Sequence, residues 1–318
     1  MFFSVIVPTC RRNDLLARCL GSLGSGGQIG AILVGPDAPP SDASLAYEVI
    51  VTDDGSEMTA EAMIGERFPW VRWTSGPKRG PAANRNHGSR CARGDWVAFI
   101  DDDCVADASW LAGLAVAARE RTWDVLEGRT LIPHRRDSPF LHAVENATGD
   151  CYWSCNLAVR RGFFLEANGF DEQFSIAGGE DMEFAWRIRQ GHWRACFCPD
   201  ALVWHPQRSY PWKAIRRSIW DRKWILLYRH KTGEAPADSA GSVRIGWAVV
   251  RAHGFALSRH LAYGWRDLRA NNWKSGLFGM FWPWLILPIQ LPHLLWWEFR
   301  FRREWPQKPR TVGTGSRP

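Results

Sequence analysis

Short apolar runs alternate with helical patterns over the first hundred residues of the chain. The runs are rich in β-branched residues and comprise Phe2–Pro8, Glu48–Thr52, Val71–Thr74 and Asp95–Ile100. Between them, apolar side chains recur at helical spacing within Asp14–Leu23, and helices are also predicted for Thr59–Phe68 and, after Pro81, for Ala82–Cys91. This alternation predicts βαβ units and therefore an α/β domain with a mainly parallel sheet flanked by helices.

The same mixed pattern continues to about residue 205 and then changes. Helical periodicity is found in Ser109–Arg121 and Asp181–Gln190, and strand-like runs are found in Val125–Ile132, Asn156–Arg160 and Ala195–His205. From Trp212 onward the sequence is basic and rich in tryptophan. We therefore predict an α/β domain over residues 1–210 and a helical region over residues 211–318. The segment Gly24–Tyr47, rich in Gly, Pro, Ser and Asp, is predicted to be a long loop.

Size and charge narrow the class of protein. The 318 residues are 46% hydrophobic, which is enough for a large buried core. The net charge of +7 favours anionic partners such as nucleotides, phospholipids or nucleic acid. The eight cysteines lack the spacing of paired zinc knuckles, so we expect reduced thiols in a cytosolic protein. The start of the chain, MFFSVIVPTC, has no basic segment of the kind found in signal peptides.

Polar residues directly follow three of the predicted strands. The three clusters are Pro8-Thr9-Cys10-Arg11, Asp53-Asp54-Gly55-Ser56 and Asp101-Asp102-Asp103. Ligands of doubly wound folds bind beyond the carboxyl ends of the strands, so these clusters mark a candidate site. Arg12 extends the first cluster and is an alternative to Arg11 as a lining residue.

The three consecutive aspartates carry the strongest chemical signal. In extended chain Asp101 and Asp103 share one face and Asp102 points away. Carboxylates this close repel one another unless a cation lies among them, although a solvated turn is the structural alternative. Oxygen ligands of this kind suit Mg²⁺ or Mn²⁺ carried on a substrate phosphate.

Two further segments have a structural and a functional interpretation. Asp53-Asp54-Gly55 is a common turn sequence, but a carboxylate there can also accept a hydrogen bond from a nucleobase or a ribose. Arg85 is either a surface charge or a nucleotide contact. In AGGEDMEFAWRIRQG, Glu180 and Asp181 are ordinary residues for the first turn of a helix, where the dipole also favours the ionised form. Glu183 lies four residues before Arg187 and predicts a helical ion pair.

In this order and at these spacings, VIVPTCRR, VTDDGS, AANRNHG, GDWVAFIDDDC and GGEDMEFAWR resemble the family 2 inverting glycosyltransferases with the GT-A fold. The resemblance covers about residues 2–206 and is bacterial in type. It implies a hexosyltransferase that uses a nucleoside-diphosphate sugar and a divalent metal, Mg²⁺ or Mn²⁺. UDP is the first expectation for the nucleotide, with GDP and dTDP as alternatives. The acceptor would be a hydroxyl group.

The resemblance also implies roles for individual residues. Asp181 would be the catalytic base, and Glu180 would hydrogen-bond an acceptor hydroxyl. Asp103 would be the direct metal ligand, joined by Asp101 and by His205 in VWHP. The donor would be bound by Pro8, Thr9, Arg11, Asp53, Asp54, Arg85, Asp101 and Asp102.

The C-terminal region suggests a membrane surface. Residues 243–269 intersperse arginines with large apolar side chains, as in a helix lying on anionic lipid or packed on the catalytic domain. Residues 276–299 are long enough to span, but Pro283, Pro288 and Pro292 favour a bent interfacial or re-entrant anchor. We expect the protein at the cytoplasmic side of the cell membrane, with a lipid-linked or envelope-polysaccharide acceptor.

Other classes explain less of the sequence. A non-catalytic nucleotide-sugar-binding protein would be expected to lose the acids, yet Asp101, Asp103 and Asp181 are all present. A sugar-phosphate nucleotidyltransferase would be expected to have a glycine- and arginine-rich loop after the first strand, which PTCRRND lacks. A nucleic-acid partner would explain the basic charge but not three acidic strand ends, so none is predicted.

Overall fold

The structure is a computed structural model, and it describes residues 1–39, 43–134, 141–142, 144–175, 177–191, 193–209, 223–233, 291–297, 299–301 and 303. The chain divides into two compact units. The first comprises Met1–Arg135 with Ala143–Arg208, and the second comprises Arg136–His142 with Ser209–Pro318. The predicted helix over residues 243–269 and most of the predicted anchor over 276–299 lie outside the described residues.

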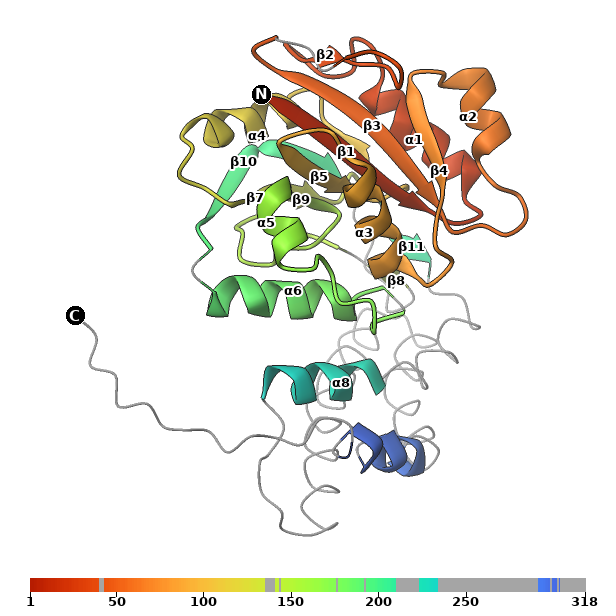
Figure 1. Cartoon of the computed structure of the whole chain (residues 1–318), viewed down its shortest axis with the longest axis vertical. Helices are drawn as coiled ribbons and strands as arrows, with labels where there is room; N and C mark the ends of the chain where they lie inside the picture. The colour runs from red at the N-terminus through yellow and green to blue at the C-terminus, as the bar shows by residue number, and fades with distance from the viewer. Residues whose placement is uncertain are drawn as a thin grey trace, which may run out of the picture. The chain divides into compact units, whose positions relative to one another are not determined.

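The first unit is built on a mixed, mostly parallel sheet of nine strands (Figure 1). Its order is β2-β3-β1-β5-β9-β7-β10-β6, and β4 pairs with β3. The strands are β1 (Phe2–Thr9), β2 (Ile32–Leu33), β3 (Ala46–Asp53), β4 (Val71–Ser75), β5 (Trp96–Ile100), β6 (Val105–Ala106), β7 (Val125–Leu131), β9 (Asn156–Arg160) and β10 (Ala195–Trp204). The predicted long loop Gly24–Tyr47 therefore contains an edge strand and the start of another.

The parallel prediction holds for the half of the sheet around β1, and β9 is the main departure from it. β1 pairs in parallel with β3 and β5, whereas β9 is antiparallel to both β5 and β7. β6 likewise runs antiparallel to β10. The parallel register aligns Thr9 with Asp53 and Ile6 with Phe99, so the carboxyl ends of β1, β3 and β5 meet at one edge.

Helices cover both faces of this sheet, which explains why its strands are apolar on both sides. The helices are α1 (Asn13–Leu23), α2 (Glu61–Arg67), α3 (Pro81–Cys91), α4 (Trp110–Arg119), α5 (Arg161–Glu166) and α6 (Gly179–Gln190). One core cluster joins α1, α2 and α4 to Val5 and Val7 of β1. A second joins α3, α5 and α6 to Ile6 of the same strand.

Close packing of α3 requires a glycine at one position. A Cβ atom on Gly88 would come within 2.6 Å of the Ile6 side chain and 2.9 Å of the Thr52 side chain. The helix can therefore lie directly against β1 and β3. This approach brings Arg85, one turn before Gly88, toward the strand ends.

Less of the second unit is described. Its helix α8 (Lys223–Thr232) and the helical residues 291–297 are present, together with the short strand β8 (Leu141–His142). The strand β11 (Arg208–Ser209) lies where the first unit ends. Within the described parts of the chain, no helix combines the length and apolar character needed to cross a bilayer.

Candidate active site

Each of the three consecutive aspartates makes its shortest ion pair with a different arginine. Arg85 donates to Asp101 at 2.7 Å, and Arg12 lies 2.9 Å from Asp102. Arg208 donates to both oxygens of Asp103, from Nη2 at 2.6 Å and also from Nε. The repulsion expected among the carboxylates is thus offset by guanidinium groups from three separate elements.

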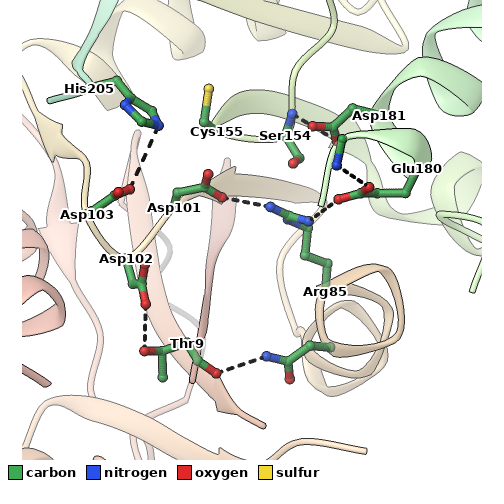
Figure 2. Close-up of polar contacts among 12 residues, drawn as sticks. Thr9, Arg85, Asp101, Asp102, Asp103, Ser154, Cys155, Glu180, Asp181 and His205 are labelled. Atoms are coloured by element: carbon green, nitrogen blue, oxygen red, sulfur yellow. Dashed lines mark hydrogen bonds and ion pairs between the residues drawn. The ribbon is translucent and has the colours of Figure 1, made fainter. Parts of the chain in front are cut away.

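Asp101 and Asp102 differ in their surroundings, although Asp102 and Asp103 lie in a turn and not in the extended chain that the sequence prediction assumed. The Asp102 side chain turns toward β1 and accepts a 2.7 Å hydrogen bond from the Thr9 hydroxyl (Figure 2). Burial raises the pKa of Asp102 to about 7, despite the opposing effects of Arg12 and Thr9. Burial acts in the same direction on Asp101, but Arg85, Arg208 and His205 outweigh it and lower its pKa.

Asp103 and His205 form the best cation site among the described residues. Nε2 of the buried His205 lies 3.8 Å from Oδ1 of Asp103. Nδ1 of His205 lies 2.9 Å from the Pro206 carbonyl oxygen, so a proton on Nδ1 leaves the Nε2 lone pair facing the carboxylate. A ligand atom of Cys104 falls within 4.8 Å of both groups. This donor set fits a divalent metal, and it includes Asp103 and His205 but not the predicted Asp101.

Arg85 connects the strand ends to the start of α6. Its guanidinium donates to Asp101 at 2.7 Å and to Glu180 at 3.0 Å, and only 4% of the residue is exposed (Figure 2). Although burial opposes it, the carboxylates of Asp101, Asp181 and Glu180 raise the pKa of Arg85, so the side chain stays charged. The helix α3 thereby brings the two acidic motifs into one site.

Asp181 also contacts the loop that contains Ser154. Its Oδ1 accepts a 3.3 Å hydrogen bond from the Ser154 backbone N–H. Burial raises the pKa of Asp181 above its ordinary value, and Arg85 and Ser154 oppose the rise. The helix N-terminus is predicted to favour the ionised form of this group, and burial opposes that effect.

Glu180 is enclosed, and each of its two carboxylate oxygens has a partner within the chain. Its side chain is fully buried, with Oε1 on Arg85 and Oε2 accepting the Gly178 N–H at 2.7 Å. Gly178 has a φ of 111°, which favours glycine at the start of this helix. Burial and the neighbouring Asp181 raise the pKa of Glu180 to about 8. The contact of Glu180 with an acceptor hydroxyl remains a prediction.

In the second polar cluster, Asp53-Asp54-Gly55-Ser56, the two aspartates accept hydrogen bonds from the backbone of nearby loops. Both oxygens of the buried Asp53 accept backbone N–H groups, from Gly55 at 2.8 Å and from Ala60 at 2.6 Å. Asp54 accepts the N–H of Lys78 at 2.9 Å and of Gly80 at 3.1 Å. These bonds hold the loops after β3 and β4 together at the edge of the site. Their predicted contacts with a nucleoside remain predictions.

The first cluster reaches the acids through Arg12. Pro8 and Thr9 are the last two residues of β1 and are buried. Arg11 donates to the Ser56 hydroxyl at 2.8 Å. The sequence left Arg11 and Arg12 as alternatives, and we gave Arg11 the binding role. The structure places Arg12 at the aspartates.

Two contributors to the site were missed in the sequence. Arg208 follows His205 by three residues, and Ser154 lies in a loop without any motif. Nothing in their local pattern distinguishes them from other polar residues. Only long-range contacts, to Asp103 and to Asp181, identify them.

Comparison with protein families agrees with this geometry. The profile described as "Glycosyl transferase family 2" matches residues 4–131, which include β1, β3 and the three aspartates. A second profile, "N-terminal domain of galactosyltransferase", matches residues 143–202, which include α6. Over residues 4–131 the chain belongs to glycosyltransferase family 2. Its α/β architecture is the GT-A fold of that family.

Several relatives of this family 2 protein have names that state an activity. It is 26% identical to the pre-mycofactocin glycosyltransferase of Mycobacterium tuberculosis over 64% of this chain and 47% of that protein. It is 27% identical to the validoxylamine A glucosyltransferase of Streptomyces hygroscopicus over 58% of this chain and 47% of the relative. The chain therefore spans about half the length of these two proteins. The succinoglycan biosynthesis protein ExoM of Rhizobium meliloti is 25% identical over 64% of this chain and 70% of its own.

Among solved structures, residues 1–349 of S. aureus TarS have a similar fold. The TM-score is 0.54 at 17% sequence identity, over 96% of this chain and 92% of the TarS chain. The same TarS fragment in complex with UDP-GlcNAc gives a TM-score of 0.52 at 16% identity, over 97% and 93% of the two chains. At these identities the likeness supports the shared fold.

Proposed function

We propose that this chain is an inverting glycosyltransferase that moves a sugar from a UDP-sugar to an acceptor hydroxyl, with Asp181 as the base. The observation that carries the proposal is the link made by Arg85. This one buried side chain joins Asp101, at the end of β5, to Glu180, next to Asp181 at the start of α6. A donor site and a candidate base are therefore parts of a single polar cluster.

The chemistry follows from the charges of the chain's own residues. Asp103 and His205 would hold a divalent ion, which when bound offsets negative charge on the diphosphate. Arg12 and Arg208 are further cations beside the aspartates and are suited to phosphate oxygens. Asp181 would take the proton of the acceptor hydroxyl as it attacks the anomeric carbon opposite the leaving group, and such displacement inverts configuration. Burial raises the pKa of Asp181, which makes its carboxylate a stronger base than that of a solvent-exposed aspartate.

Relatives support the donor class. TarS has been solved with UDP-GlcNAc, and the Streptomyces relative is named as a glucosyltransferase. We therefore propose a UDP-hexose donor. A binding protein or a nucleotidyltransferase would not need Asp181 beside an intact aspartate cluster, so both alternatives account for less of the site.

The test of the base is Asp181→Asn in the full chain. We expect transfer to fall by about 10²–10⁴-fold, the usual contribution of a positioned acid or base. Donor affinity, measured by calorimetry with UDP-sugars and Mn²⁺, should remain close to that of the wild type. The control is Glu183→Gln, since Glu183 lies on the same helix but pairs with Arg187 at 2.8 Å. Wild-type turnover in Asp181→Asn would contradict the proposal.

We also propose that the second unit docks on the cytoplasmic face of an anionic membrane, which would suit a lipid-linked acceptor. The support is a patch in which Trp296 and Phe299 are 55% and 62% exposed. The Arg300 guanidinium lies 5.7 Å from the Trp296 ring centre, and that of Arg303 lies 6.0 Å from the Phe299 ring centre. Exposed aromatic and basic side chains together are typical of interfacial segments.

Vesicle sedimentation tests the membrane proposal. The full chain should sediment with vesicles containing phosphatidylglycerol and much less with neutral phosphatidylcholine vesicles. Replacing Trp296 and Phe299 by serine should weaken the binding. Equal sedimentation of the variant and the wild type would exclude this patch as the contact.

A further inference from the structure

A carboxylate outside the proposed catalytic cluster is buried in the middle of β7. Glu127 is only 2% exposed. Its oxygens accept the Asn146 side-chain amide at 2.8 Å and the backbone N–H groups of Asp150 at 2.7 Å and Cys151 at 2.8 Å. The N–H of Tyr152 also donates to it. Burying a charge is costly without such bonds, so the carboxylate and the loop that encloses it depend on each other.

The loop is bent to bring three successive N–H groups onto this one carboxylate. Gly149, Asp150 and Tyr152 all have positive φ values, of 87°, 67° and 54°. For Asp150 and Tyr152 these are sparsely populated conformations, which persist only where surrounding contacts hold them. The N–H groups of Asp150 and Tyr152 both donate to Glu127, and the Asp150 carbonyl oxygen accepts a hydrogen bond from Arg189.

The same loop reaches the proposed base. Ser154, two residues after Tyr152, donates its backbone N–H to Asp181. Arg189, on α6, donates to the Asp150 carboxylate at 3.1 Å and to the Asp150 carbonyl oxygen, and it lies 5.4 Å from the Tyr152 ring centre. The loop is therefore attached to β7 through Glu127 and to α6 through Asp181 and Arg189.

We propose that Glu127 is a positioning residue for the reaction, which shapes the loop 149–154 so that Ser154 presents its N–H group to Asp181. The inference rests on the proposed role of Asp181 as the base. Glu127 acts from a distance and touches neither donor nor acceptor. Its removal should leave the aspartate cluster at the donor side intact, because Glu127 has no hydrogen bond to that cluster among the described residues.

The test compares Glu127→Gln with Glu48→Gln, a matched control. Glu48 is also 2% exposed and lies within a strand, β3, but its partners are Ser4 and Arg93. In Glu127→Gln an NH₂ group replaces one carboxylate oxygen. Only one oxygen then remains to accept hydrogen bonds from the N–H groups of the loop. We expect kcat to fall by about 10–100-fold, as for a misplaced catalytic group, while donor affinity changes less than about twofold.

The pH profile distinguishes positioning from stability alone. A hydrogen bond from Ser154 lowers the pKa of Asp181, so its loss should raise that pKa and shift the acidic limb of kcat to higher pH. Glu48→Gln should lower the melting temperature without moving this limb. If the two variants behave alike, or if Glu127→Gln loses donor affinity as well, the positioning role is overturned.

A second variant covers the case in which Glu127→Gln does not fold. Arg189 is largely at the surface, with 42% of its side chain exposed, so Arg189→Met should fold and loosen the other attachment of the loop. Arg189→Met should shift the acidic limb of the kcat–pH profile to higher pH, by less than Glu127→Gln does. An unshifted acidic limb would count against the proposal. If Asp181→Asn keeps its activity, the proposed base is wrong. If Asp181→Asn is inactive but Glu127→Gln and Arg189→Met behave as the wild type does, only the positioning role of Glu127 is wrong.

Discussion

The site has two acidic regions, one at the end of β5 and one at the start of α6. Both contain carboxylates, but the number of arginines close to those carboxylates differs. At the end of β5, Asp101 is in reach of two guanidinium groups, those of Arg85 and Arg208, and its pKa is lowered. At the start of α6, Glu180 and Asp181 are close to each other and to Arg85, and both pKa values are raised. The comparison shows that the balance between nearby cations and burial lowers the pKa of Asp101 and raises the pKa values of Glu180 and Asp181.

Replacing the residue shared by the two regions should have the largest effect. Arg85→Met leaves Asp101 and Glu180 without their common partner. We expect transfer to be lost and the free energy of unfolding to fall by about 3–5 kcal/mol, as when one member of a buried ion pair is removed.

Urea denaturation and a transfer assay measure the two effects. Arg85→Lys is the matched control, since a single ammonium group keeps the charge but cannot bridge both carboxylates in the same way. An active, fully stable Arg85→Met variant would show that the two regions function independently.

The metal side should be separable from the base side. His205→Ala removes the imidazole that faces Asp103 and should weaken Mn²⁺ binding by at least about tenfold, since even outer-shell changes have that effect. Arg208→Gln should strengthen Mn²⁺ binding, because its guanidinium occupies Asp103 in this structure.

Calorimetry or electron paramagnetic resonance of Mn²⁺ measures both changes. Asp181→Asn, on the other region, serves as the control and should bind Mn²⁺ as the wild type does. Equal affinities in all variants would exclude Asp103 and His205 as the metal site.

The smallest expected effect concerns the pH dependence of stability. The folded state raises the pKa of Glu180 from 4.5 to about 8, so the folded protein binds more protons than the unfolded chain between those pH values. This group therefore lowers stability progressively as pH rises through the window. Glu180→Gln lacks the titration and should gain stability relative to the wild type between pH 5 and pH 8.

Urea denaturation at several pH values gives the difference. In contrast, the lowered pKa of Asp101 should make its contribution to stability fall as the pH is reduced toward that pKa. A constant difference between Glu180→Gln and the wild type across the window would contradict the assignment of a raised pKa to Glu180.

The sequence predicted most of the first unit because its signals are local. Apolar runs, helical spacing and polar strand ends identified β1, β3, β5 and the helices between them. The antiparallel β9 was not foreseen as such, because strand direction depends on which neighbours a segment meets. The edge strand β2 was missed inside a Gly- and Pro-rich segment, since two residues carry too little pattern.

The residue types of the site, aspartates at strand ends and a Glu-Asp pair at a helix start, were already evident in the chain. Their order and spacing were also enough to indicate the family. Which arginine meets which aspartate, and how far burial raises the pKa of Asp181, were decided only by tertiary structure. Those properties depend on distances between residues far apart in sequence and on the exclusion of water, and neither is encoded in any short segment.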